Sequence, residues 1–259
     1  MNQTKWLTAA SWAVAAICLA GFLAFGYATE LDRRQHAIRP DDGCLAYAPP
    51  PAVTLVLIDR TDPLQGDQPR RWRAALDSEV ARLPAGGVLL IGAIGPSTPA
   101  EMSLVRLCKP LAGRGVRAVQ LQEAFSDRLD AIERDLRRSP AASRSAILGT
   151  IVTGASDPAF LIRTSGPRRI LVISDLLEND EPASVYRRGG LSLPDGAGAP
   201  LAGATIRFAV LHNLRDGRLQ TRQLIDAWTR WAAGPAGAQA VEADAAWLGY
   251  RADARGGGR

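Results

Sequence analysis

The sequence is poor in the residues that most often carry out catalysis or bind transition metals. It contains 2 histidines and 3 cysteines in 259 residues. It has no zinc-ligand spacing, no glycine-rich phosphate loop and no internal repeat. With only His36 and His212, acid–base catalysis by histidine has little support. The net charge of +5 is spread over short arginine-rich stretches, so we expect no nucleic-acid partner.

Charged residues are missing from a long N-terminal stretch. No charge occurs between Trp6 and Thr29, which is long enough to cross roughly 30 Å of hydrocarbon. A cleaved signal peptide is the alternative, but its apolar region is usually only about 7–15 residues. We therefore predict a retained single-pass anchor over residues 1–29, followed by a linker over residues 30–52 that ends in three prolines.

Two observations give opposite locations for the soluble part. Arg33, Arg34 and Arg39 follow the predicted span, and a count of positive charges would place the C-terminal part in the cytoplasm. Cysteine usage favours export, because Cys44 and Cys108 remain outside the span and suit one disulfide in an oxidising compartment. Two unrelated buried thiols are the alternative. We favour a periplasmic domain on the bacterial inner membrane, with a cytoplasmic domain as the alternative.

Apolar runs alternate with helical patterns from residue 53 to residue 250. Strands are predicted at residues 53–59, 88–94, 170–175, 204–211 and 240–248, and helices at residues 68–83 and 124–138, from Ser143 or Ser145 onward, and at residues 221–233. Residues 102–107 fit an edge strand or a short helix, residues 178–200 a surface loop, and residues 251–259 a disordered tail. The predicted fold is α/β, with a doubly wound, mostly parallel sheet of five or six strands.

Two of the buried strands end in an aspartate. Asp59 closes the first strand and Asp175 closes a strand far downstream. Ligands of open parallel sheets bind outside the carboxyl ends of the strands, so both carboxylates are expected to face one crevice. Two carboxylates with a nearby hydroxyl suit a hard divalent cation. The alternative is that each aspartate only caps the loop after its strand.

The order of elements and the Asp59-x-Thr61 motif resemble the von Willebrand factor A (vWA) domain over residues 53–248. That family binds a divalent cation at a metal-ion-dependent adhesion site. The resemblance implies an Mg²⁺ site formed by Asp59, Thr61, Ser145 and Asp175. The family's usual Asp-x-Ser-x-Ser has Pro63 at its last position here, and its Thr-Asp-Gly becomes Ser-Asp-Leu around Asp175. Asp62 is a candidate for the missing oxygen.

The resemblance implies a protein that binds other proteins rather than an enzyme, so no small-molecule substrate is expected. We expect a membrane-tethered interaction or scaffold domain, one subunit of a larger bacterial envelope complex. A metal-dependent phosphohydrolase with Asp59 as its nucleophile is one alternative. Haloacid dehalogenase-like phosphatases need a second acid two residues on, where this chain has Thr61. A structural α/β domain with a decayed metal site is the other alternative.

Overall fold

The computed structural model describes residues 3–35, 37–39, 43–62, 65–95, 102–111, 116–138, 144–180, 183–188, 190–195 and 198–255. Pro63, the departure from the adhesion-site motif, lies outside this set. The chain divides into two compact units, one of residues 1–40 with 45–48 and one of residues 41–44 with 49–259.

The first unit consists mainly of helix α1 (Gln3–Gln35). This helix contains the uncharged stretch of the sequence, and its described apolar side chains are exposed, among them Ile17, Phe22 and Phe25. None of the helices that the structure describes combines the length and the apolarity required of a membrane span. After α1 the chain turns back on itself at a bridge between Ile38 and Leu45.

The second unit is an α/β domain, as predicted, with a sheet of seven strands in its described residues instead of five or six. The strands are β1 (Val53–Asp59), β2 (Val88–Ile94), β3 (Val105–Cys108), β4 (Arg168–Ser174), β5 (Ala204–Val210), β6 (Ala240–Ala245) and β7 (Tyr250–Arg255). Their order is β3-β2-β1-β4-β5-β6-β7, with β3 and β7 antiparallel to their neighbours and the others parallel. The chain runs outward from β1 on one side and from β4 on the other, so the sheet reverses its winding between these two strands.

The two edge strands compare differently with the prediction: β3 matches one of its two interpretations, and β7 was not predicted. Part of the segment with two interpretations forms β3, so the edge-strand interpretation is confirmed; the strand is exposed at Val105 and buried at Leu107 and Cys108. The tail predicted to be disordered from Arg251 instead forms β7 through Arg255. Arg251 pairs with Asp244 of β6 at 3.5 Å, and the Tyr250 hydroxyl donates to Asp226 at 2.5 Å. Antiparallel backbone pairing with β6, supplemented by these polar contacts, holds a strand that carries no apolar run.

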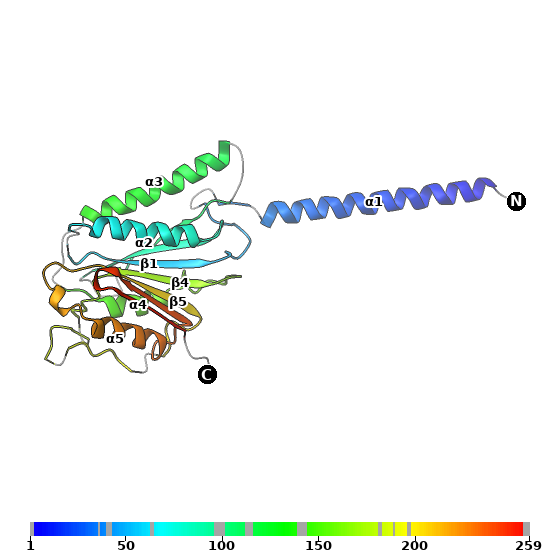
Figure 1. The fold of residues 1–259 in the computed structure, drawn as a ribbon. Coiled ribbons are helices and arrows are strands. Elements are labelled where there is room, and N and C mark those ends of the chain that lie inside the picture. Colours follow the sequence, from blue (N-terminus) through cyan, green and yellow to red (C-terminus); the bar gives the residue numbers. More distant parts are fainter. Residues whose placement is uncertain are drawn as a thin grey trace. The chain divides into compact units, whose positions relative to one another are not determined.

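Helices cover both faces of the sheet (Figure 1). Helices α2 (Gln68–Arg82) and α3 (Val116–Arg138) lie on one face, and α4 (Ile147–Ser156) and α5 (Arg222–Ala233) lie on the other. Alternate residues of β1 enter the two cores: Val56 packs in a cluster with Trp72 of α2, and Leu55 in a cluster with Trp228 of α5. Burial on both faces explains why the strand reads as an unbroken apolar run.

Two further segments fasten the domain. Cys44 and Cys108, paired in the sequence analysis, form a disulfide with Cα atoms 5.0 Å apart, which joins the segment before β1 to edge strand β3. The excursion predicted as surface loop is partly inside the domain, because Glu178, Ala183 and Val185 are buried. Apolar residues spaced along a polar loop pin it to the core.

Candidate functional site

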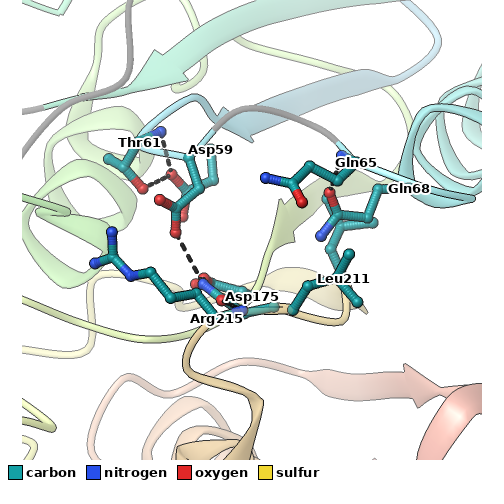
Figure 2. Close-up of a pocket in the computed structure, with 10 residues that line it drawn as sticks. Asp59, Thr61, Gln65, Gln68, Asp175, Leu211 and Arg215 are labelled. Atoms are coloured by element: carbon teal, nitrogen blue, oxygen red, sulfur yellow. Dashed lines mark hydrogen bonds between the residues drawn. The ribbon is translucent and has the colours of Figure 1, made fainter.

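A cavity of about 380 Å³ opens at the carboxyl ends of β1 and β4, where the sheet reverses its winding. This is the position at which open α/β sheets bind ligands. Figure 2 shows Thr61 turned toward Asp59 on one side, with Gln65 and Gln68 across the cavity from them. The lining comprises Asp59, Thr61, Asp62, Gln65, Gln68, Asp175, Leu211, Asn213, Leu214 and Arg215.

Asp59 accepts four hydrogen bonds. Its Oδ1 accepts the backbone N–H of Thr61 at 3.0 Å and the Thr61 hydroxyl at 2.6 Å. Its Oδ2 accepts the hydroxyls of Ser174 at 2.6 Å and Ser145 at 3.2 Å. A carboxylate has about four lone-pair sites, so the protein already uses all of them. A cation at Asp59 must therefore displace a donor or bind to the hydroxyl oxygens in front of it.

Asp175 faces the same cavity and uses only part of its accepting capacity. Its Oδ1 accepts the backbone N–H of Leu177 at 2.8 Å, and its Oδ2 accepts the side-chain amide of Asn213 at 2.7 Å. The same amide donates to Asp62 at 2.8 Å. One neutral group thus bridges two carboxylates, and both keep lone pairs that are available to a ligand.

Burial makes the negative charge of this site costly. It raises the pKa of Asp175 to about 7, and the neighbouring Asp59 carboxylate adds to the effect. Burial also raises the pKa of Asp59, while the hydrogen bonds from Ser174, Thr61 and Ser145 oppose that rise. A cation would favour the ionised forms of both residues, because it supplies the positive charge that these surroundings lack.

A further buried acid lies behind the site. Glu178 accepts the backbone N–H of Leu148, in the first turn of α4, at 2.6 Å through Oε2, and its Oε1 has no partner in the described structure. Burial raises its pKa to about 8. At neutral pH the side chain is therefore largely protonated, so it holds the loop after β4 against α4 without adding a full charge.

The backbone after β4 is strained. Leu176 has a φ of 61° although its side chain is fully buried. Its N–H donates to the Ser174 hydroxyl at 2.9 Å, and its carbonyl accepts the Trp228 indole N–H at 3.1 Å. The left-handed conformation costs a residue with a Cβ roughly 1–2 kcal/mol. This leucine takes the place of the glycine in the motif that the sequence resembles, and packing and two hydrogen bonds keep it there.

Three of the four predicted site residues are in direct contact, since Thr61 and Ser145 both donate to Asp59. Asp175 lines the same cavity, where it accepts hydrogen bonds from Leu177 and Asn213, and Ser145 contacts Asp59 from outside the lining. Sequence reasoning gave no role to Ser174 or Asn213. Both lie at the ends of strands on this rim, so the rule that found the aspartates could have found their positions, but not the bridge that Asn213 makes between Asp62 and Asp175.

Oxygen atoms dominate the donor set, which fits a hard cation such as Mg²⁺. The hydroxyls of Thr61 and Ser145 donate hydrogen bonds to Asp59, so the lone pairs of their oxygens point elsewhere and can bind a cation. Thr61, Asp62 and Asp175 line the cavity and would hold the ion there. In the part of the chain that the structure describes, no group of three or more acidic, histidine or cysteine side chains is already arranged around a metal position.

Comparison with known proteins adds no family to this description. The chain matches no protein-family model and no curated protein sequence. The vWA resemblance therefore depends on the motif residues, and the function must be argued from the site.

Proposed function

We propose that this protein is a membrane-tethered, vWA-like interaction or scaffold domain, one component of a larger bacterial envelope complex. Its binding surface is the rim of the sheet around the cavity, and Mg²⁺ completes that surface. The observation that carries the proposal is the cluster of Thr61, Ser145 and Ser174 hydroxyls on Asp59 at the point where the sheet reverses its winding.

The hydroxyl cluster supports binding of a cation. Asp59 fixes the orientation of the hydroxyls by accepting their hydrogen bonds, and an oriented hydroxyl oxygen can serve as a ligand for Mg²⁺. Asp62 and Asp175 add carboxylate oxygens to the lining of the same cavity. When bound, Mg²⁺ would supply an open coordination position to which a partner's oxygen atom can bind.

The residues around the mouth of the cavity support contact with a protein. Leu214 is 59% exposed and Arg215 lies beside it in the lining, while Tyr186, 48% exposed, is hydrogen-bonded to the same turn through Asp216 at 3.3 Å. Tyrosine and arginine are enriched among the residues that dominate protein interfaces. An apolar and aromatic rim around a polar centre is therefore consistent with docking of a partner.

The tether is proposed from the sequence and the disulfide. The uncharged stretch from Trp6 to Thr29 would anchor the chain in the bacterial inner membrane. The disulfide between Cys44 and Cys108 favours the periplasmic side, because structural disulfides persist in oxidising compartments. The partners would then be other protein subunits at the membrane surface.

Thermal melting of the full chain in detergent, with Mg²⁺ or with EDTA, tests the cation. A ligand at a hundred times its Kd stabilises by about 2.7 kcal/mol, which is roughly 5–10 °C for a domain of this size. We expect such a shift in the wild type and its loss in Thr61→Val, which removes a cavity hydroxyl. Thr205→Val, on β5 and away from the cavity lining, is the matched control and should keep the shift. A wild type that melts identically in Mg²⁺ and EDTA would leave a structural domain with a decayed site.

A further inference from the structure

We propose that Asn213 is the positioning residue of the cavity, and that its amide stands in for the cation by holding Asp62 and Asp175 together when no ion is bound. The inference rests on the proposed function for the identity of the ion and adds a mode of regulation to that same site. Asn213 lies in the turn after β5 and is 4% exposed.

Hydrogen bonds fix which end of the Asn213 amide faces the carboxylates. Its Oδ1 accepts the backbone N–H groups of Arg215 at 2.9 Å and Asp216 at 2.8 Å. Only the NH₂ end is then free to donate to Asp62 and Asp175. The backbone N–H of Asn213 donates to Gln220 Oε1 at 2.7 Å, so the turn holds the residue at its main chain as well.

A cation that draws the same two oxygens together competes with this amide. The Asn213 nitrogen is 2.7 Å from Asp175 Oδ2 and 2.8 Å from Asp62 Oδ2. A cation that binds both oxygens from the side of the amide would lie about 2.0–2.6 Å from each, too close to the nitrogen for both to be held. When the ion enters, Asn213 loses both acceptors and its hold on them.

The consequence reaches the surface of the domain. The turn that Asn213 anchors carries Leu214 and Arg215 at the mouth of the cavity. Release of the amide loosens that turn, so the loaded and empty sites present different surfaces to a partner. Occupancy of the cavity thereby controls docking without a movement of the sheet.

The variant Asn213→Asp isolates the bridging donor. The variant keeps the side-chain oxygen that accepts from Arg215 and Asp216, so the turn is retained. It replaces the NH₂ donor with an oxygen, which places a third carboxylate beside Asp62 and Asp175. In EDTA we expect the full chain in detergent to melt about 5 °C or more below the wild type. Adding Asp62→Asn restores the charge and returns an amide to the cluster, and should recover most of the loss. Melting within about 1 °C of the wild type, or no recovery in the double variant, would overturn the proposal.

Hydrogen exchange in the unmodified protein provides the second measurement. Competition predicts that Mg²⁺ speeds exchange at the backbone amides of Arg215 and Asp216, whereas an ion that merely joins the site would slow it. Slower exchange in a protein whose melting temperature rises with Mg²⁺ would refute the competition and leave the proposed function intact. If Mg²⁺ changes nothing, the proposed function fails, and the comparison of variants in EDTA still decides whether Asn213 bridges the carboxylates.

Discussion

The raised pKa of Asp175 predicts that the cation-free protein loses stability as the pH rises toward neutrality. The pKa is about 7 in the folded protein against an ordinary value of 3.8, so the folded state binds the proton more tightly than the unfolded chain does. The stabilisation is complete below the lower value and is lost as the pH rises through the higher one. The difference corresponds to about 4 kcal/mol.

Asp175→Asn removes this titration while keeping the shape of the side chain. Any hydrogen bond that the new amide loses is independent of pH, so it shifts the stability curve without changing its slope. Urea unfolding of the full chain in EDTA, between about pH 5 and pH 7, should give the wild type a steeper loss of stability than the variant. The slope of one titrating group cannot exceed about 1.4 kcal/mol per pH unit, so we expect a difference of about 2 kcal/mol across this range.

A control and a cation complete the experiment. Asp195→Asn changes an exposed aspartate in a loop and should keep the slope of the wild type. Mg²⁺ should flatten the slope of the wild type, because the ion favours the charged form of Asp175. Parallel curves for the wild type and Asp175→Asn would refute the reasoning, since they would mean that Asp175 ionises in the folded protein as easily as in the unfolded chain.

Three further predictions concern stability. Leu176→Gly should be at least as stable as Leu176→Ala in urea unfolding, because glycine relieves the strain at φ 61°, although both variants lose about 2–5 kcal/mol of packing. At Leu177, which is also buried, the alanine variant should be more stable than the glycine variant by about 1 kcal/mol. If alanine were the more stable replacement at both positions, Leu176 would not be strained. Cys108→Ser should lower the free energy of unfolding by about 2–5 kcal/mol under oxidising conditions, and a reductant should abolish the difference. Glu178→Gln should change the free energy of unfolding little at about pH 6. It should also remove the loss of stability that the wild type shows as the pH rises to 8, the pKa of this acid. Parallel stability curves for the wild type and the variant would mean that Glu178 is not protonated in the folded protein.

Strands with strong apolar runs could be predicted closely, and those without could not. β1 ends at Asp59 as predicted, because an unbroken run of buried residues followed by polar ones has one interpretation. β7 has alternating small and charged residues, and it is held by backbone pairing with β6 and by contacts to Asp244 and Asp226, none of which a local apolar pattern reveals. Helix α3 begins at Val116, earlier than its apolar stripe suggested, since Val119 in its first turns is exposed.

The site was predictable where a residue type and a position both pointed to it. Asp59 and Thr61 belong to a short motif at the end of a buried strand, and the structure places them in hydrogen-bond contact. Asn213 has no motif, and its role depends on Asp62 and Asp175, which lie 151 and 38 residues away in the chain. A bridge between three loops is set by the topology of the sheet, and no local pattern contains it.

The state of Asp59 bears on the choice between binding and hydrolysis. A carboxylate nucleophile needs a free lone pair and an approach path for the substrate. Asp59 is 9% exposed, and its two oxygens accept four hydrogen bonds from Thr61, Ser145 and Ser174. Attack would require breaking bonds to segments from three parts of the chain, whereas binding of a cation to the Thr61 oxygen requires none of them to break. The same hydrogen bonds that make Asp59 a poor nucleophile make it a good support for ligands, which is why we argue for a docking site rather than a phosphohydrolase.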